Sequence, residues 1–416
     1  MSNRVVVIGG GPAGLMAAGQ AALRGLEVYL LERNPRPARK LLITGKGRCN
    51  ITNALFDVNE VIENVVTNGR FLYSALTAFM TYDTVAFFEE RGVKTKTERG
   101  NRVFPESDKA VSVVDAMVSF AKESGVLIKT DTRVSSFVFE DGKISAVVLE
   151  NGGKIDCGAV ILATGGKSYP GTGSTGDGYR LAASAGHTVT EIRPSLVPMT
   201  VHQGWCSDLM GLSLKNTGIK ILDEKGKSVY ADFGEMLFTH FGVSGPMILS
   251  ASAHLGDIRK KKFRLVVDLK PALTEEQLEA RILRDFKENA NKDFINSLSA
   301  LLPHKMIPVI VRLSGIEPGT KCNQITKAQR RSFVRLLKNL ELDITGFRPI
   351  DEAIVTSGGV KVSEIEPKTM RSKLMPNLYF AGEVIDTDAY TGGFNLQIAF
   401  STGYLAGTKV LEERTK

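Results

Sequence analysis

Apolar and polar positions near the start of the chain fall into short continuous runs separated by one longer stretch. The run 5–8 is apolar throughout, which is typical of a strand buried on both faces of a parallel sheet. An Ala-rich stretch of helical composition follows it, and a second apolar run ends at Glu32. A strand, a helix and a second strand in this order predict a βαβ unit and therefore an α/β fold.

Three glycines at a fixed spacing occupy the turn between the first strand and the helix. Gly9 permits a tight turn, Gly11 lets the backbone approach a pyrophosphate, and Gly14 lets the helix pack close to the sheet. Glu32 lies 18 residues beyond Gly14, near the spacing at which a carboxylate reaches the hydroxyl pair of a ribose. The helix N-terminus adds free N–H groups and partial positive charge. We therefore expect a Rossmann-like dinucleotide site rather than a tight turn without a ligand. Its expected residues are Gly9, Gly11, Pro12, Ala13, Gly14, Glu32 and Arg33.

Two further glycine-rich turns follow apolar strands later in the chain. One is the stretch 161–166, Ile-Leu-Ala-Thr-Gly-Gly, and the other begins where a strand ends at Gly382 and Glu383. The segment 391–393, Thr-Gly-Gly, then opens a helix. Together with the first glycine loop, these turns resemble the FAD-binding fold shared by succinate dehydrogenase, fumarate reductase and aspartate oxidase. The resemblance implies non-covalent FAD, rather than NAD, in the N-terminal site.

The same resemblance implies where each turn meets the cofactor. The acid after the last strand meets the ribityl chain, and this superfamily usually has Asp where the chain has Glu383. The last helix directs its N-terminus at the flavin N1 and C2 carbonyl, where it stabilises the negative charge of reduced flavin. The backbone near Val134 meets the adenine. The residues added to the expected site are Val134, Ala163, Thr164, Gly165, Gly166, Tyr169, Gly176, Gly382, Glu383, Gly393, Asn395, Leu396 and Gln397.

The segment 40–53, Lys-Leu-Leu-Ile-Thr-Gly-Lys-Gly-Arg-Cys-Asn-Ile-Thr-Asn, narrows the resemblance further. It resembles the bacterial BaiN/RdsA family, also labelled aminoacetone oxidase-like flavoproteins. Some members of that family reduce a steroid alkene in bile-acid dehydroxylation, and others make dihydrouridine in ribosomal RNA. The resemblance therefore implies an FAD-dependent oxidoreductase that reduces an activated carbon–carbon double bond. Shorter matching motifs lie at 103–106, 194–198, 237–246 and 368–373.

The 40–53 segment also has the residue types that a flavin site needs. Its glycines let backbone lie against the isoalloxazine edge, and Lys40 and Arg48 can approach the cofactor or an anionic substrate. The alternative is a solvated basic loop, because six Lys and Arg residues fall between 33 and 48 with no acid among them. Cys49 has no second cysteine nearby, which favours a structural thiol over a redox one. The expected site residues here are Lys40, Gly45, Arg48, Cys49 and Asn50.

Reduction of an enone-type bond needs hydride from flavin N5, a proton donor, and a group that stabilises negative charge at the carbonyl. Arg48 is the candidate for charge stabilisation, and His240 or Tyr390 for proton donation. His240 lies in an apolar Thr-His-Phe-Gly setting, so a satisfied core histidine is an equal interpretation. Three alternatives remain open: a small-molecule enoyl or steroid-type reductase, an oxidase of a small amine or ketone using oxygen, and an FAD-containing RNA-binding protein without turnover.

A second dinucleotide-binding domain is not expected. The stretch 171–176 matches the pattern GxGxxG, but it follows Tyr169 and Pro170 rather than a strand. NAD(P)H as the reductant would therefore bind transiently in the substrate cleft, or another protein would donate the electrons. The four cysteines form no CxxC pair, which argues against a metal site and a redox dithiol and suits a reducing cytosol.

The chain, at 416 residues, is too long for a single core. We expect a discontinuous Rossmann-like FAD-binding domain built from both chain ends, with an inserted β subdomain and a small helical cap. The insertion begins with a hairpin pattern around 219–229 and a strand at 263–269, and two Thr-x-x-Gln capping boxes, at Thr274 and Thr326, start helices. The resemblance implies that the insertion roofs the flavin. The expected boundaries are 1–193 and 345–416 for the FAD-binding domain, 194–270 and 320–344 for the β subdomain, and 271–319 for the cap.

Positive charge is concentrated in one segment of the insertion. Residues 256–340 hold 18 Lys and Arg against nine Asp and Glu, and this surplus accounts for the net charge of +8 of the whole chain. The segment is densest at 259–262 and 330–331. It predicts either a solvated basic face or a platform for a polyanion such as ribosomal RNA. The first strand begins almost at Met1 and no stretch suits a membrane span, so we expect a cytoplasmic protein without membrane contact.

Overall fold

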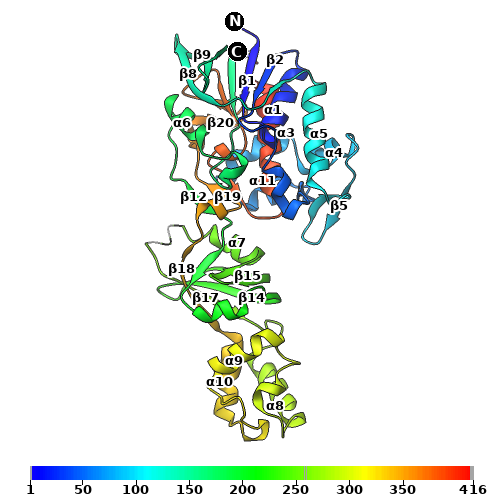
Figure 1. The fold of residues 1–416 in the computed structure, drawn as a ribbon, viewed down its shortest axis with the longest axis vertical. Helices are drawn as coiled ribbons and strands as arrows, with labels where there is room; N and C mark the ends of the chain where they lie inside the picture. Colours follow the sequence, from blue (N-terminus) through cyan, green and yellow to red (C-terminus); the bar gives the residue numbers. More distant parts are fainter. Residues whose placement is uncertain (1, 257, 259, 413–416) are drawn as a thin grey trace. The chain divides into compact units, whose positions relative to one another are not determined.

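The computed structural model describes residues 2–256, 258 and 260–412, and the chain divides into two compact units (Figure 1). Unit 1 is Met1–Ser195 with Pro349–Lys416, and unit 2 is Leu196–Arg348. Unit 1 is therefore discontinuous, with unit 2 inserted into it. Among the described residues, no helix has both the length and the apolar character needed to cross a bilayer.

Unit 1 is built on a seven-stranded sheet in the order β20-β21-β22-β11-β1-β2-β7. The continuous apolar run at the start of the chain forms β1, which is buried and lies in the middle of the sheet, so the predicted βαβ unit is confirmed. The C-terminal strand β22 pairs in parallel with β11, which brings the two chain ends into one sheet. The strands are β1 (Arg4–Ile8), β2 (Glu27–Leu31), β7 (Leu127–Lys129), β11 (Ala159–Leu162) and β22 (Leu378–Phe380), all parallel, and the antiparallel edge strands β20 (Ile365–Glu366) and β21 (Arg371–Ser372).

Two helices from opposite ends of the sequence pack directly on each other in unit 1. A Cβ added to Gly403 of α11 would lie 2.4 Å from the Ala13 carbonyl oxygen of α1, and one added to Gly407 would lie 2.3 Å from the Ala17 carbonyl oxygen. Glycine at these positions lets the two backbones touch. The helices of unit 1 are α1 (Pro12–Leu23), α2 (Val58–Glu63), α3 (Tyr73–Ala78), α4 (Thr81–Glu89), α5 (Ala110–Glu123), α6 (Asp177–Ser184) and α11 (Phe394–Lys409).

Small sheets complete unit 1. They carry several of the loops that the sequence assigns to the cofactor. These sheets are β10-β9-β8, β3-β6-β5, β12-β19 and β23-β4. Their strands are β3 (Thr52–Asn53), β4 (Val65–Thr67), β5 (Thr95–Glu98), β6 (Arg102–Pro105), β8 (Val134–Glu140), β9 (Lys143–Leu149), β10 (Lys154–Asp156), β12 (Arg193–Ser195), β19 (Val355–Ser357) and β23 (Asp388–Ala389).

Unit 2 begins as a closed six-stranded barrel. The predicted hairpin around 219–229 is β14 (Ser213–Asp223) with β15 (Ser228–Thr239), and the predicted strand at 263–269 is β17 (Phe263–Asp268), so both are confirmed. The barrel order is β13-β16-β15-β14-β17-β18. The remaining elements are β13 (Met199–Val201), β16 (Gly242–Ser244), β18 (Leu340–Phe347) and helix α7 (Pro246–Ser252).

A helical part follows within unit 2 and shares its hydrophobic core with the barrel. Both predicted capping boxes are present. The hydroxyls of Thr274 and Thr326 each accept a hydrogen bond from the backbone N–H three residues later, and the backbone N–H of each Thr donates to the side-chain oxygen of that Gln. Helix α10 packs on α8, so the helical part extends to residue 338, beyond the cap boundary expected at 319. Its helices are α8 (Glu275–Glu288), α9 (Ile307–Ser314) and α10 (Lys327–Lys338).

Candidate functional site

The three glycines of the first loop differ in the space around them: Gly9 and Gly14 are tightly packed, and Gly11 is open. A Cβ on Gly9, whose φ is +104°, would lie 2.5 Å from the Ala163 carbonyl oxygen, and one on Gly14 would lie 1.9 Å from the Gly9 carbonyl oxygen. Gly9 also donates its N–H to the Leu31 carbonyl, 2.9 Å away. No atom lies within 4 Å of a Cβ built on Gly11. Two glycines therefore form the turn, and the middle one leaves room for a ligand.

Gly11 is also the N-cap of α1, and the start of this helix is unusually bare. It has no side-chain cap and no acid in its first turn, and Pro12 occupies the first helical position. Within the described residues, the backbone N–H groups of Ala13 and Gly14 have no acceptor. Unsatisfied N–H groups and the helix dipole together form an anion-binding site.

The Glu32 carboxylate is 6% exposed and accepts hydrogen bonds from the backbone of the first loop. Among the described residues no cation forms an ion pair with it. One carboxylate oxygen accepts from the Gly10 N–H at 2.8 Å, and the other accepts from the Asn34 backbone N–H at 2.8 Å and side-chain amide at 2.7 Å. A carboxylate has about four lone-pair sites, so one remains for another donor. The predicted ribose contact of Glu32 is compatible with this geometry and stays a prediction.

Arg33 follows β2, and its guanidinium contacts the start of α6. Its guanidinium is 2.6 Å from Thr175 Oγ1 and 3.0 Å from Asp177 Oδ2. Arg133 pairs with both oxygens of the same carboxylate at 2.9 Å, and this pairing lowers the pKa of Asp177. Arg33 is therefore committed to a protein carboxylate. Val134, at the start of β8, follows Arg133 directly and is 3% exposed.

Lys40 and Glu383 meet although they are far apart in sequence. The Lys40 Nζ lies 3.0 Å from Glu383 Oε2 and 2.7 Å from Ser168 Oγ, and the Thr356 N–H donates to Glu383 Oε1 at 2.9 Å. Burial acts to raise the pKa of Glu383, but the Lys40 ammonium and the Thr356 N–H outweigh it and hold the pKa below its usual range. Sequence reasoning named the ion-pair partners separately and missed Ser168 and Thr356, which no local motif marks.

The turn after β11 fits tightly around this pair. A Cβ on Gly166 would lie 2.3 Å from Thr356 Oγ1, and Gly165 has a φ of +73°. Thr164 Oγ1 is buried without a hydrogen-bond partner. The stretch 171–176 follows a short 3₁₀ turn rather than a strand and ends at Gly176, the N-cap of α6, as the sequence indicates. Ala163 and Tyr169 flank the same turn, and Tyr169 has a φ of +51°.

Arg48 does not present a free positive charge. Its Nε lies 2.8 Å from Asp108 Oδ1, its Nη1 lies 3.2 Å from Glu98 Oε2, and the guanidinium carbon lies 4.1 Å from the centroid of the Phe104 ring. These hydrogen bonds raise the pKa of Arg48 and lower that of Glu98. The sequence left a solvated loop or a charge for substrate as alternatives. In the structure, a carboxylate on β5 and another in the β6–α5 loop pair with the guanidinium, so its charge is compensated; the approach of Arg48 to the cofactor stays a prediction.

Cys49 and Asn50 follow in a backbone of unusual conformation. Cys49 is fully buried with a φ of +61°, and burial raises the pKa of its thiol to about 12. The thiol is therefore protonated at neutral pH, in agreement with a structural role. Asn50 Oδ1 is buried with no hydrogen-bond partner among the described residues. Gly45, with a φ of +55°, approaches Asn50: a Cβ on Gly45 would lie 3.1 Å from the Asn50 nitrogen.

The first turn of α11 corrects part of the predicted site. Gln397 is fully buried: its Oε1 accepts from Thr52 Oγ1 at 2.6 Å and Thr84 Oγ1 at 2.8 Å, and its Nε2 donates to the Phe79 carbonyl at 3.0 Å. It is satisfied inside the protein and is not available to a cofactor. Asn395 is equally committed, since its side chain bonds the backbone of Ala389 and Tyr390. Leu396 is only partly buried.

The backbone at the start of α11 remains available. Its N-cap, Gly393, has a φ of +99°, and a Cβ there would lie 2.3 Å from the Thr52 carbonyl oxygen. The helix has no side-chain cap and no acid in its first turn. Gly382, in the short turn after β22, donates its N–H to Thr402 Oγ1 of α11 at 2.9 Å. The N-terminus of α11 thus offers N–H groups in the same way as that of α1.

The contacts between α1 and α11 show how these two helix starts are placed. Gly403 lies on Ala13 and Gly407 on Ala17, so the helices run in the same direction. At 1.5 Å per residue, the start of α11 lies about 12 Å beyond that of α1 along the helix axes. Unit 1 therefore presents two helix N-termini that point the same way on adjacent helices, offset by about 12 Å along the helix axes. An elongated ligand with negative charge at two separated points would satisfy both.

The two predicted proton donors belong to different units. His240 is exposed in the turn between β15 and β16 of unit 2, with its ring 4.9 Å from that of Phe241. It is therefore not a core histidine, because the Thr-His-Phe-Gly segment is a hairpin turn rather than a strand interior. Tyr390 is partly buried in unit 1, directly after β23, and its N–H donates to the Asn64 carbonyl at 3.0 Å.

Comparison with known proteins gives a family match over nearly the whole chain. The family model described as HI0933-like protein Rossmann domain matches residues 3–409. A 3-dehydro-bile acid delta(4,6)-reductase of Clostridium scindens is 33% identical over 99% of this chain and 99% of the relative. A ribosomal RNA dihydrouridine synthase of Escherichia coli is 28% identical over 99% of this chain and 98% of the relative.

Solved structures share the fold at low sequence identity. The open conformation of a flavocytochrome c3 fumarate reductase has a TM-score of 0.52 at 16% identity, covering 98% of this chain and 77% of that one. A 3-ketosteroid-delta4-(5alpha)-dehydrogenase from Rhodococcus jostii has a TM-score of 0.52 at 15% identity, covering 98% and 96%. The Rossmann-like fold predicted from the glycine loops is confirmed.

Proposed function

The chain belongs to the HI0933-like Rossmann family, and on that premise we propose that it is an FAD-dependent oxidoreductase that reduces the C5–C6 double bond of uridine in ribosomal RNA. The observation that carries the cofactor assignment is the pair of uncapped helix starts of the adjacent helices α1 and α11, which point the same way and are offset along the helix axes. The observation that favours RNA is unpaired positive charge on the helical part of unit 2.

The residues of unit 1 fit FAD. The open position at Gly11 and the free N–H groups of Ala13 and Gly14 suit a pyrophosphate. The N-terminus of α11 suits the negative charge that reduced flavin carries near N1. Bound FAD would supply hydride at N5, and the offset between the two helix ends suits a long cofactor with these two charged regions.

Reduction of a conjugated double bond also needs a proton. Hydride adds to one carbon of the double bond, and the other carbon takes a proton from a donor in the site. We assign the proton to the phenol of Tyr390, which follows β23 near the start of α11. His240, exposed in unit 2, is the alternative donor. Arg48 is not proposed as the stabiliser of substrate charge, because Glu98 and Asp108 already neutralise it.

The positive charge of segment 256–340 divides into paired and unpaired residues. The paired cations each lie within 4 Å of a carboxylate and contribute little long-range field. Within the described residues, four exposed cations of helices α8 and α10 have no such partner, and Arg259 lies outside those residues. The unpaired four are Arg284, Lys287, Lys327 and Arg335. The paired residues are Arg264, Arg281, Arg312, Lys321, Arg330, Arg331 and Lys338.

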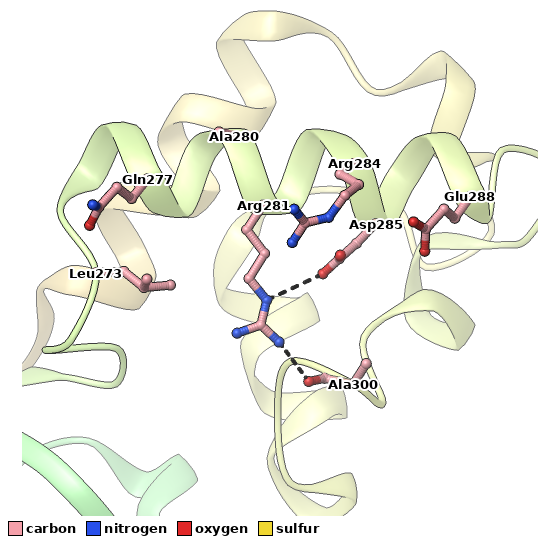
Figure 2. Close-up of a pocket in the computed structure, with 8 residues that line it drawn as sticks. All are labelled: Leu273, Gln277, Ala280, Arg281, Arg284, Asp285, Glu288 and Ala300. Atoms are coloured by element: carbon pink, nitrogen blue, oxygen red, sulfur yellow. Dashed lines mark hydrogen bonds and ion pairs between the residues drawn. The ribbon is translucent and has the colours of Figure 1, made fainter.

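The contrast between paired and unpaired cations is visible on α8. A pocket of about 680 Å³ lies beside this helix. Figure 2 shows Arg281 bonded to Asp285 and to the Ala300 carbonyl, while no such bond joins Arg284 to the residues drawn. On α10, Lys327 and Arg335 lie eight residues apart and therefore on one face of the helix. These free cations suit the phosphates of an RNA backbone better than a steroid acid, which has one negative charge.

NAD(P)H is the proposed reductant, binding transiently, since unit 1 has one glycine loop of the strand–turn–helix kind among its described residues. We propose a cytoplasmic location, since an enzyme that modifies ribosomal RNA acts where ribosomes are. The small-molecule enoyl reductase, the oxygen-dependent oxidase and the FAD-containing RNA-binding protein remain the competing functions, and one experiment separates all four.

The experiment follows the visible absorbance of the flavin under anaerobic conditions in the FAD-loaded protein. NADPH or NADH is added first, and ribosomal RNA that lacks dihydrouridine is added next. Bleaching by the nicotinamide and recovery on RNA, with dihydrouridine detected by mass spectrometry, is the expected result. Recovery only on admission of air indicates the oxidase, and recovery with a steroid enone but not RNA indicates the small-molecule reductase. RNA binding without recovery indicates a protein whose flavin is structural.

The RNA surface is tested by the salt dependence of binding. The triple substitution Arg284→Gln, Lys327→Gln and Arg335→Gln should weaken RNA binding at all sequences and lower the slope of log K against log salt by about 2. The matched control is Arg312→Gln, which removes a cation already paired with Asp208. An unchanged slope in the triple variant would place the RNA contact elsewhere.

A further inference from the structure

Three loops that are distant in sequence converge on the carboxylate of Glu383. Lys40 comes from the loop after β2, Ser168 from the turn after β11, and Thr356 from β19. Glu383 itself is the middle residue of the 3₁₀ turn 382–384 after β22. All four belong to unit 1. The carboxylate is therefore contacted by all three other residues.

The contacts use most, but not all, of the carboxylate's acceptor capacity. Oε1 accepts from the Thr356 N–H at 2.9 Å and from Ser168 Oγ and Lys40 Nζ at 3.3 Å. Oε2 is bonded by Lys40 Nζ at 3.0 Å. The Gly166 backbone N–H also acts on this carboxylate. Among the hydrogen bonds of the described residues Oε2 has Lys40 as its one donor, and a carboxylate oxygen has two lone pairs. A hydroxyl of a bound cofactor is a donor of the right kind.

Both charged groups are largely withdrawn from water. The Lys40 and Glu383 side chains are 22% and 21% exposed. The other titratable group that faces Glu383 is the phenol of Tyr179 from α6, and burial raises its pKa so that it stays neutral. Lys40 is therefore the cation that compensates the carboxylate. Breaking a buried pair by removing one partner leaves an uncompensated charge, which the remaining group relieves by changing protonation.

We propose that Lys40 is a positioning residue that holds Glu383 ionised and oriented, so that the carboxylate can accept a hydroxyl of the FAD ribityl chain. This inference rests on the proposed cofactor and goes beyond it, because it makes the two residues one functional unit. Glu383 stands where the resembled superfamily usually has Asp, and its side chain is longer and more flexible. Contacts with Lys40, Ser168 and Thr356 hold its carboxylate in one position.

The consequence for pH follows from the contacts. In the native protein, Lys40 keeps the pKa of Glu383 below its usual range, so FAD affinity should be flat between about pH 6 and about pH 9. In Lys40→Met only the Thr356 and Gly166 N–H groups still oppose burial, so the pKa of Glu383 rises and the carboxylate takes up a proton as the pH falls. FAD affinity of this variant should therefore decline toward low pH and recover toward high pH.

The test is titration of the refolded or dialysed apoprotein with FAD, followed by flavin fluorescence across this pH range. Lys40→Met should weaken FAD binding about 10- to 100-fold at neutral pH, with the pH dependence just described. Lys40→Arg, which keeps the charge, should recover most of the affinity. Lys46→Met is the matched control, because Lys46 is an exposed lysine of the same loop with no carboxylate partner among the described residues, and it should bind FAD as the native protein does.

A double-substitution cycle separates a functional unit from two independent contacts. Glu383→Gln should weaken FAD binding without pH dependence, and Lys40→Met with Glu383→Gln should cost less than the sum of the two single effects. Equal loss of affinity at every pH in Lys40→Met, or additive effects in the cycle, would overturn the role of Lys40. Failure of the native protein to bind FAD would overturn the cofactor assignment itself, whereas FAD binding without RNA turnover would overturn the proposed substrate alone.

Discussion

The starts of α1 and α11 are alike in backbone and different in surroundings. Each begins at a glycine, without a side-chain cap and without an acid in its first turn. At α1 the N-cap Gly11 is open to ligand, while at α11 the N-cap Gly393 is packed against the Thr52 carbonyl. The first-turn side chains of α11 are also consumed by protein contacts. Backbone N–H groups are thus the shared binding element, and the side chains at α11 serve to hold the helix in place.

The largest effect should come from adding a methyl group where the backbones touch. Gly14→Ala and Gly393→Ala each place a Cβ within 2.3 Å of a backbone oxygen. Backbone cannot give way as a flexible side chain does, so we expect each to lower the free energy of unfolding by more than about 3 kcal/mol. Urea unfolding of the apoprotein, followed by circular dichroism, measures this. A shift below about 1 kcal/mol at Gly393 would show that the start of α11 is not packed as described.

The second prediction decides whether the Gln397 side chain is a buried structural amide or a ligand of the cofactor. Gln397→Leu removes the acceptor of the Thr52 and Thr84 hydroxyls and one donor to the Phe79 carbonyl. Thr84 keeps its bond to the Met80 carbonyl and Phe79 its bond from Ser401, so the Thr52 hydroxyl is the group left without a partner. We expect a loss of about 2–4 kcal/mol in unfolding free energy, because unsatisfied buried polar groups are costly. The same urea series measures it. If stability is retained and FAD affinity alone falls, Gln397 faces the cofactor after all.

Gly11→Ala should behave in the opposite way. No atom lies within 4 Å of the added Cβ, so the stability of the apoprotein should change by less than about 0.5 kcal/mol. FAD affinity should fall about tenfold, since the methyl group occupies the space where the pyrophosphate approaches the backbone. Gly319→Ala in unit 2 is the control, an equally open glycine, and should change neither quantity. Unchanged FAD affinity in Gly11→Ala would remove the pyrophosphate from this helix.

The smallest effect concerns the loop that leads to Thr52. Cys49 is fully buried and its pKa is raised to about 12, so the thiolate becomes populated only near that pH. Alkylation of native protein by iodoacetamide at about pH 8 should therefore not modify Cys49. Peptide mass spectrometry reads the result, and urea-unfolded protein gives the positive control. Rapid native modification would reopen the redox interpretation of this thiol.

Local sequence patterns predicted the backbone part of the site well. The spacing of Gly9, Gly11 and Gly14 defines a turn and a helix start within a few residues, so its geometry follows from nearest neighbours. The capping boxes at Thr274 and Thr326 are equally local and are confirmed. The positions of these elements depend on few distant contacts.

Side-chain roles depended on distant partners and were predicted less well. The charge of Arg48 is neutralised by Glu98 and Asp108, which come from another strand and loop. Gln397 had a local signal that was missed: α11 is apolar on nearly all faces, so it is a buried helix and its polar residues bond protein. The Lys40–Glu383 pair had none, because its members lie 343 residues apart.

The contact of α11 with α1 bears on how the protein is made. Strands β1, β2 and β11 leave the ribosome first, but β22 and α11, which cover β11 and α1, follow only after all of unit 2. At elongation rates of about 5–20 residues per second the nascent chain waits roughly 10–40 s with an unpaired strand edge and a bare apolar helix face. The first half of the cofactor domain should therefore be a client of nascent-chain chaperones, and cofactor loading should be strictly post-translational.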